Sequence, residues 1–210
     1  MTKRKIDHIV YCVPDLKDAI TYFTDSLGII PYIGGKHLLK GTENALINLG
    51  NGCYLELLAI DHENKNVSTP RWMGIDFIRG PKITRWAIQS ENLNEDQRIL
   101  KTYNPKMGVI EEGQRKTNKG SLLKWHMTLP LSEPDVELIP FVLSWKESAH
   151  HPTDKMKTQC SLQSISFHTV DEVEHKKRCF QDLSINNKIH LSTKTKITAT
   201  IEGPKGSIVL

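Results

Sequence analysis

The sequence has no apolar run long enough to cross a membrane, and it has few cysteines for its length. A membrane-spanning helix needs about 20 consecutive apolar residues, and no segment of the 210 residues approaches this. The basic residues Lys3, Arg4 and Lys5 are not followed by the apolar stretch of a secretory signal peptide. The four cysteines form no CxxC pair, which argues against a zinc ribbon or a disulfide scaffold. We therefore predict a cytoplasmic protein with reduced thiols and no membrane partner.

Concentrated positive charge and the common catalytic motifs are also missing. The 28 Lys and Arg against 24 Asp and Glu give a net charge of +4, and the basic residues are spread along the chain. Nucleic-acid binding usually needs a basic cluster on one face, so no nucleic-acid partner is predicted. The sequence lacks G-x-S-x-G, H-E-x-x-H, G-x-x-x-x-G-K-[ST] and G-x-G-x-x-G. With 38% hydrophobic and 25% charged residues, its composition is that of an ordinary globular domain.

The chain contains instead a repeated order of predicted elements. Residues 5–12 are rich in β-branched side chains and predict a strand. The apolar periodicity predicts a helix over 15–27, with Asp15 as N-cap and Gly28 as a left-handed C-cap. Three strands are predicted next, at Ile29–Gly34, Glu43–Leu49 and Cys53–Ile60. The dipeptide Asn51-Gly52, a strong hairpin signal, separates the last two.

The same order of strand, helix and three strands recurs twice. The second unit is predicted at Ile83–Gln89, a helix starting at Asn94, Gly108–Glu112, Ser121–Leu129 and Val136–Trp145. The third is predicted at Ser161–Thr169, Asp171–Leu183, Ile189–Thr193, Lys196–Glu202 and Ser207–Leu210. The helix starts at Asp15, Asn94 and Asp171 are 79 and 77 residues apart, and such a near-constant period indicates internal duplication. We predict an α+β protein of repeated β-α-β-β-β modules.

Two polar residues in predicted apolar strands, Glu56 and His8, are candidate functional residues. Glu56 stands in the run Cys53–Ile60, where an unpaired buried carboxylate would cost several kcal/mol. It therefore meets a cation or a metal, is neutral, or lies on a solvated edge strand. His8 shares an otherwise apolar strand face with Val10, and such a histidine is more often a core residue than a ligand. Imidazole and carboxylate together, however, are workable ligands for a divalent metal.

Other candidates are less well determined by their context. His37 follows two glycines that would let a ligand approach, but the segment is equally typical of an exposed loop. His126 lies in a predicted strand and could face water, and His151 lies in a polar linker that could fold over a pocket mouth. A cysteine–histidine pairing with Cys12 or Cys53 stays open, although a thiol in an apolar strand is more often inert packing.

Taken in order, several motifs make the chain resemble the vicinal-oxygen-chelate superfamily of glyoxalases, bleomycin resistance proteins and extradiol dioxygenases. The β-α-β-β-β units and the opening Ile6-Asp7-His8-Ile9-Val10 with Val13-Pro14-Asp15-Leu16 carry the general resemblance. A narrower resemblance to the glyoxalase-like domain branch is carried by Gly34-Gly35-Lys36-His37, Gly41–Leu46, Tyr54-Leu55-Glu56-Leu57, Pro140-Phe141, Trp145 and His151-Pro152.

The resemblance implies cupped mixed β-sheets with helices on the outside. Residues 1–155 would form one domain of two paired modules (1–69 and 81–146), and residues 159–210 a third, divergent module. His8 and Glu56 match metal-ligand positions of the first module. In the second module, alignment puts Arg85 opposite His8 and Phe141 near Glu56, and neither is a metal ligand, so the four-ligand site of glyoxalase I is not present.

Because two of the four ligand positions are replaced, two kinds of pocket are possible. A half-site could be completed by His37 as third ligand, giving a metal set of His8, Glu56 and His37. Alternatively, Arg85 and Glu56 could pair in a pocket that needs no metal. Four residues are predicted to contact the substrate: Asn44, Arg85, His126 and His151.

The resemblance thus predicts a metal-dependent enzyme of lyase, isomerase or dioxygenase type that acts on a small oxygen-rich organic substrate. The cofactor would be a divalent ion (Zn, Mn, Fe, Ni or Co), or none, and Glu56 could act as general base. The alternative is a metal-free small-molecule binding or resistance-type protein, in which Trp72, Trp86, Trp125 and Trp145 could line the pocket. Because three modules leave one unpaired, we predict a homodimer in which the third module pairs with its copy.

Overall fold

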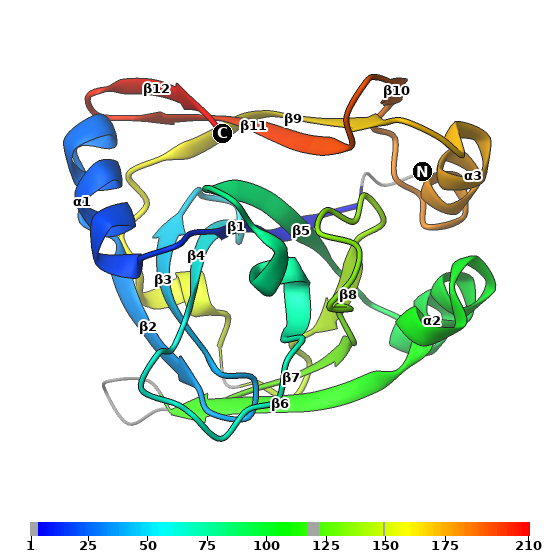
Figure 1. The fold of residues 1–210 in the computed structure, drawn as a ribbon, viewed down its shortest axis with the longest axis horizontal. Coiled ribbons are helices and arrows are strands. Elements are labelled where there is room, and N and C mark those ends of the chain that lie inside the picture. The colour runs from blue at the N-terminus through cyan, green and yellow to red at the C-terminus, as the bar shows by residue number, and fades with distance from the viewer. Residues whose placement is uncertain (1–3, 117–121, 149) are drawn as a thin grey trace.

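The computed structural model describes residues 4–116, 122–148 and 150–210, and its first module has the predicted order of elements (Figure 1). This module comprises β1 (Ile6–Cys12), α1 (Leu16–Leu27), β2 (Tyr32–His37), β3 (Thr42–Asn48) and β4 (Tyr54–Ile60). The predicted caps of α1 are confirmed: Asp15 accepts a hydrogen bond from the Asp18 amide, and Gly28 has a φ of 74°.

The second module repeats this order, with several element boundaries that differ from the prediction. It comprises β5 (Lys82–Gln89), α2 (Leu93–Tyr103), β6 (Ile110–Lys116), β7 (Leu122–Thr128) and β8 (Phe141–Ser144). The N-cap of α2 is Asn92, not Asn94, because the stripe of apolar residues already begins at Leu93 and Asn92 accepts from the Glu95 amide. The predicted strand from Val136 is shorter, because the Glu137 carboxylate accepts the Ile139 amide hydrogen that a strand partner would otherwise take.

The third module comprises β9 (Ser161–Thr169), α3 (Val173–Asp182), β10 (Ile189–Leu191), β11 (Lys196–Gly203) and β12 (Gly206–Val209). Three short 3-10 helices complete the described elements: η1 (Trp72–Phe77), η2 (Pro105–Gly108) and η3 (Pro152–Lys155). No helix in the described ranges has the length and apolarity that a membrane crossing requires.

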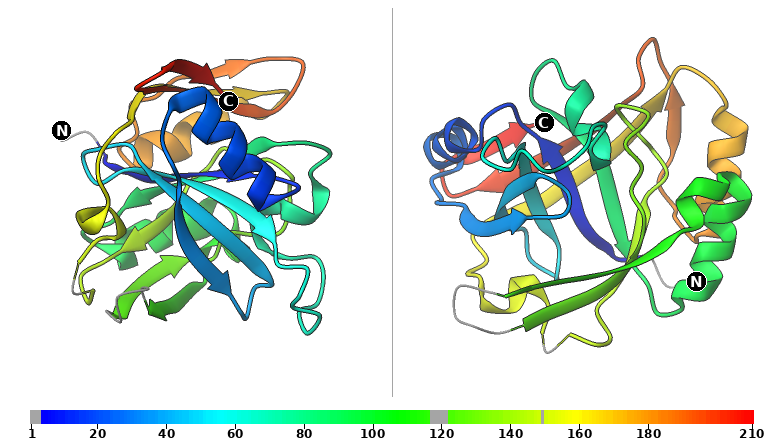
Figure 2. Two further views of the ribbon diagram at one scale, coloured as in Figure 1. Left: turned by 90° about the vertical axis from the view of Figure 1, so that its left-hand side faces the viewer. Right: turned by 60° about the horizontal axis from the view of Figure 1, so that its bottom comes forward.

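The first two modules share one curved sheet. β1 and β5 pair antiparallel at its centre, and each continues to a parallel neighbour, β4 and β8 respectively. The sheet then extends outward through β3 to β2 on one side and through β7 to β6 on the other. Figure 1 shows these strands curving around η1, and Figure 2 shows the helices outside the curve. The α+β class with outer helices is confirmed.

The third module covers the outer face of this cup. Its strand β11 pairs with β5 at Ile197 and Ile83, and one apolar core joins it to β1, β4 and β5. Trp86 points outward into this core, 4.7 Å from the Phe167 ring and 5.9 Å from the Phe180 ring. The third module thus buries its apolar face against its own chain, whereas the homodimer stays a prediction.

Removing the side-chain cap of α1 is expected to destabilise the fold moderately. Asp15→Ala should lower the free energy of unfolding by about 1 kcal/mol, because the Asp18 amide loses its acceptor at the helix start. Urea unfolding followed by circular dichroism measures the change. Asp25→Ala is the matched control: it removes an exposed carboxylate near the other end of α1 and should cause no loss of stability. Equal losses in both variants would contradict the capping argument.

Candidate active site

A small cavity lies on the inner face of the cup, where β1, β3 and β4 run side by side. Its volume is about 40 Å³, and its polar lining consists of His8, His37, Asn44 and Glu56, surrounded by aromatic and apolar side chains. His8 and Glu56 are buried, with 3% and 5% exposure. The structure therefore brings together the two residues that the sequence singled out, with 3.7 Å between His8 Nε2 and Glu56 Oε2.

Asp7 orients His8 from the opposite side of the imidazole ring. The pairing of β1 with β5 is irregular between Ile6 and His8, and the Asp7 carboxylate lies 2.7 Å from His8 Nδ1. Its other oxygen accepts a hydrogen bond from Trp145 Nε1 at 2.8 Å and lies 3.3 Å from His151 Nε2. Asp7 thereby ties β1 to the segment after β8 and leaves His8 Nε2 as the nitrogen that faces the cavity.

Asp7 is a fully buried carboxylate that stays ionised. Burial by itself raises its pKa, but the hydrogen bonds from His151 and His8, with the charges of both rings, hold the pKa well below its ordinary value of 3.8. A permanent negative charge beside His8 Nδ1 fixes the orientation of the ring. The face of the ring is fixed as well, because Tyr54 stacks on it at 4.6 Å and Phe141 meets it edge-on at 5.2 Å.

Glu56 is held by Asn44 from the neighbouring strand. Asn44 Nδ2 donates to Glu56 Oε1 at 2.5 Å and lies 3.4 Å from His37 Nε2. His37 Nδ1 in turn lies 3.0 Å from the Thr42 hydroxyl, which accepts a hydrogen bond from Trp72 Nε1. The three side chains are positioned by the antiparallel pairing of β2, β3 and β4.

The other predicted site residues lie farther from this centre. His151 is the N-cap of η3 and reaches the site through Asp7. His126 lines a larger cavity in front of the first one and lies 3.2 Å from Glu112. Arg85 lies outside the lining of either cavity, among the described residues. Its guanidinium donates to the backbone carbonyls of Thr84, Leu131, Pro134 and Asp135, so the predicted pairing with Glu56 is not formed.

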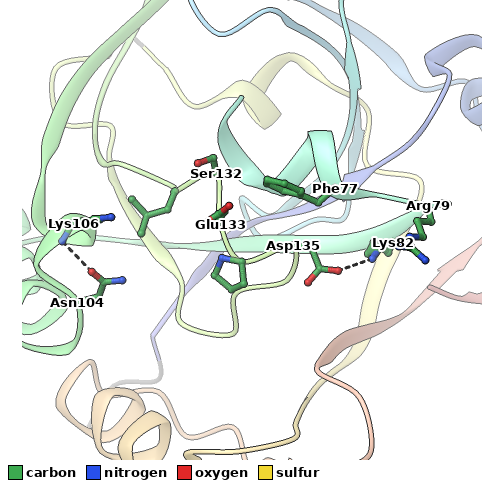
Figure 3. A pocket seen from close by; sticks show the side chains of 10 residues that line it. Phe77, Arg79, Lys82, Asn104, Lys106, Ser132, Glu133 and Asp135 are labelled. Carbon is green, nitrogen blue, oxygen red and sulfur yellow. Dashed lines mark hydrogen bonds and ion pairs between the residues drawn. The ribbon is translucent and has the colours of Figure 1, made fainter. Parts of the chain in front are cut away.

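Arg85 instead shapes an open groove on the outside of the cup. The carbonyls that it binds belong to the loop 131–135, which forms one wall of a 910 Å³ groove (Figure 3). Figure 3 shows Asp135 paired with Lys82 on one side of the groove, and Lys106 joined to Asn104 on the other. The groove is broad and lacks converging buried acid–base groups in the described part of the chain, so the smaller cavity is the better candidate active site.

The second module carries different residues at the positions equivalent to His8 and Glu56. The helix caps Asp15 and Asn92 are 77 residues apart, and the same offset takes His8 to Arg85 and Val10 to Ala87. Glu56 pairs opposite Val10, and Phe141 pairs opposite Ala87. Two of the four equivalent positions therefore carry Arg and Phe.

The remaining residues do not form a complete metal centre. Two ligands at about 2.1 Å from an ion lie about 3.4 Å apart in tetrahedral geometry, close to the 3.7 Å between His8 Nε2 and Glu56 Oε2. His37 Nε2 lies 4.0 Å from Glu56 Oε1. Even so, no group of three or more His, Cys, Asp or Glu side chains in the described ranges is arranged to hold a metal ion. Within these ranges the cavity brings together residue types that can bind a metal, but not the full set of ligands that a closed metal centre needs.

The cysteines offer no nucleophile. All four are free and buried. Burial raises the pKa of Cys12 and of Cys53 to about 12, so neither is a thiolate at neutral pH. The cysteine–histidine alternative is therefore disfavoured by the surroundings of these two thiols.

Sequence reasoning missed Asp7 and Tyr54 as parts of the site. Strand alternation places Asp7 on the opposite face from His8, and only the irregular pairing of β1 lets its carboxylate reach the ring. Strand alternation puts Tyr54 on the same face as Glu56, two residues away, and this was the available signal. Of the four tryptophans, Trp72, Trp125 and Trp145 line the cavity, whereas Trp86 lies on the outer face.

Comparisons with known proteins agree with this architecture. A family model described as a glyoxalase-like domain matches residues 6–182. The crystal structure of a hypothetical protein from Staphylococcus aureus is similar with a TM-score of 0.64 and 16% identity, covering 99% of this chain and 98% of that one. Methylmalonyl-CoA epimerase from Mycobacterium tuberculosis matches with a TM-score of 0.40 and 21% identity over 67% of this chain and 85% of that one. At 16% identity the likeness to the Staphylococcus aureus protein concerns the fold alone. No curated protein sequence matches the chain.

Proposed function

Because the chain belongs to the glyoxalase-like domain family, we propose that it is an enzyme of lyase or isomerase type that acts on a small oxygen-bearing organic molecule by proton transfer at His8 and Glu56. The observation that carries this proposal is the buried pair itself. Two titratable side chains face one cavity 3.7 Å apart, and each is held by a partner of its own, Asp7 for His8 and Asn44 for Glu56. Such positioned acid–base groups in a cavity are a typical basis of catalysis.

The proposed reaction begins at a carbon next to a carbonyl group. Glu56 takes a proton from this carbon, and His8 in its protonated form donates the proton on Nε2 to the carbonyl oxygen, which gives an enol. Return of the proton to another carbon or to the other face completes an isomerisation or epimerisation, and loss of a neighbouring group gives a lyase reaction. Asp7 stabilises the orientation of His8 throughout, because it accepts the hydrogen on Nδ1.

Deuterium exchange tests this proposal without knowledge of the natural product. The wild-type protein is incubated in D2O with a panel of α-hydroxy ketones and aldehydes, both aliphatic (acetoin, glyceraldehyde) and aromatic (α-hydroxyacetophenone). Proton NMR should show protein-dependent loss of the signal of the hydrogen next to the carbonyl group. Exchange no faster than with heat-denatured protein for every member of the panel would count against the proposal.

A metal-dependent reaction is the second candidate, and one observation favours it. The hydrogen bond of His8 Nδ1 to a buried carboxylate is the arrangement that orients metal-binding histidines. His8 and Glu56 would hold the divalent ion, with His37 as the nearest further donor. The ion would polarise a substrate oxygen, and ring-opening dioxygenation belongs to this candidate because it requires a redox metal.

Chelation separates the two candidates. Under the first proposal, we expect deuterium exchange to stay within about twofold after treatment with EDTA, since proton transfer by His8 and Glu56 needs no ion. Elemental analysis of the untreated protein provides the second measurement. Close to one metal ion per chain in the wild type, lost in His8→Ala and retained in His62→Ala at the exposed loop position, would establish the metal-dependent candidate instead.

The non-enzymatic alternative is a protein that binds a small molecule without a metal ion. Its support is the aromatic lining, since Trp72, Trp125 and Trp145 all border the cavity. Binding of ligands without any deuterium exchange or other turnover would favour it over both enzymatic candidates.

A further inference from the structure

The inner cavity adjoins a second, larger one. The outer cavity of 650 Å³ lies between the β2–β3 turn and the strands β6 and β7. Four residues line both cavities and thus form their junction: His37, Trp72, Trp125 and Met127. A ligand that reaches Glu56 through this junction has part of its structure in each cavity.

The inner cavity admits only a small head group. Its 40 Å³ is about the space of one water-sized group, such as a hydroxyl or an amide. One of its lining residues has an unsatisfied buried acceptor: Asn44 is 4% exposed, and its Oδ1 has no hydrogen-bond partner among the described residues. Asn44 Nδ2 donates a hydrogen bond to Glu56, and this bond fixes which end of the amide is the oxygen. A buried carbonyl oxygen without a hydrogen bond is unfavourable, so a ligand that donates a hydrogen bond to Asn44 Oδ1 would be stabilised. The adjacent Glu56 carboxylate disfavours an anionic head group.

The junction presents flat aromatic surfaces in fixed positions. The indole of Trp72 is held by its hydrogen bond to the Thr42 hydroxyl at 3.1 Å. The indole of Trp125 lies over the backbone of Gly113, its partner across β6 and β7, where a Cβ would come within 2.1 Å of the ring. Gly113 therefore allows Trp125 its position. Rigid indole faces favour planar ligands through stacking.

From these features we propose that the site binds a neutral planar molecule, aromatic or heteroaromatic, whose head group is a hydrogen-bond donor. The donor, a hydroxyl or an amide N–H, enters the inner cavity and binds Asn44 Oδ1. The ring lies in the outer cavity against Trp125, near the exposed side chains of Leu38 and Leu39. Gly113 is a specificity-determining residue because it sets the place of the Trp125 ring. This inference rests on the proposed function only because it assumes that the ligand binds in the cavity where the proposed reaction takes place.

Three matched probes test the proposal in the full chain: 4-methylphenol, toluene, which lacks the hydroxyl, and 4-methylcyclohexanol, which lacks the flat ring. Dissociation constants come from NMR titration and are expected near the millimolar range for molecules of this size. We expect 4-methylphenol to bind about tenfold more tightly than toluene, because of the bond to Asn44. It should also bind about tenfold more tightly than 4-methylcyclohexanol, because of stacking.

Variants assign each preference to its residue. Asn44→Leu should abolish the advantage of 4-methylphenol over toluene, and Trp125→Leu should abolish its advantage over 4-methylcyclohexanol. Gly113→Ala should act like Trp125→Leu, since it displaces the ring without removing it. Asn94→Leu on α2 and Phe77→Leu in the outside groove are the exposed controls and should keep both preferences. Thermal melts identify variants that do not fold, and Gly113→Ala provides the test if Trp125→Leu fails.

Several results would overturn the proposal. These are failure of 4-methylphenol to bind at 10 mM, equal binding of the three by the wild type, or unchanged ratios in Asn44→Leu and Gly113→Ala. Binding is measured without turnover, so the two proposals fail separately. Probe selectivity without deuterium exchange would overturn the proposed function and keep this inference, whereas exchange without selectivity would do the reverse.

Discussion

Replacing Glu56 with glutamine is expected to lower the rate of substrate deuterium exchange by about 10²–10⁴-fold, the usual contribution of a positioned general base. Glutamine has the same shape and can still accept the hydrogen bond from Asn44, but its amide cannot take a proton. The rate is measured by NMR in D2O with the best member of the hydroxycarbonyl panel, at saturating and at low concentration. The loss should appear in kcat rather than in KM, because binding contacts are largely retained.

The matched control is Glu202→Gln, which makes the same chemical change at an exposed position on β11. This variant should keep the wild-type rate. If Glu56→Gln folds, as judged by its melting temperature, and exchanges deuterium as fast as the wild type, then Glu56 is not the general base.

Replacing Asp7 with alanine is expected to have the largest effect on stability, a loss of about 3–5 kcal/mol in the free energy of unfolding. The reason is that one fully buried carboxylate serves three side chains: His8, Trp145 and His151. Its removal leaves the buried His8 ring and the partly buried Trp145 and His151 rings without this acceptor. Urea unfolding at pH 7, followed by circular dichroism, measures the loss.

The contribution of Asp7 should depend on pH in a defined direction. The pKa of Asp7 in the folded protein is held below its ordinary value of 3.8, chiefly because the hydrogen bonds of His151 and His8 outweigh the opposing effect of burial. Its stabilisation is therefore fully present above about pH 4 and is lost as the pH falls toward the folded-state pKa. The stability difference between wild type and Asp7→Ala should therefore decrease as the pH falls below about 4.

Two further variants make the Asp7 prediction specific. Trp145→Phe removes one donor and leaves the carboxylate in place, so it should cost less than Asp7→Ala. Asp25→Asn changes an exposed carboxylate on α1 and should cost little. A loss for Asp7→Ala no larger than that for Asp25→Asn would contradict the role of the buried network.

Local patterns were sufficient for most elements of the fold. The β-branched run of β1 and the caps Asp15 and Gly28 of α1 are short-range signals, and the structure has each where it was predicted. The second helix was misplaced by two residues because Asn92 and Asn94 are equally good caps by residue type. Only the packing of Leu93 inside the first turn distinguishes them.

The site was only partly predictable for a related reason. His8 and Glu56 stand out because a polar group in an apolar strand needs a partner, and this argument requires no tertiary information. The same argument applies to Arg85, but its partners are backbone carbonyls of the loop 131–135. Every residue has a backbone carbonyl, so no sequence pattern predicts which carbonyls a side chain will bind.

The sequence by itself determined the modules, the repeat of strand, helix and three strands, and the two polar positions His8 and Glu56. These features follow from periodicity and capping, which act over a few residues. The tertiary structure alone decided that Asp7 reaches His8, that Asn44 holds Glu56, and that Trp125 borders both cavities. Such contacts depend on strand register and on an irregularity in one strand pair, and register is set by the packing of the whole sheet rather than by neighbours in the chain.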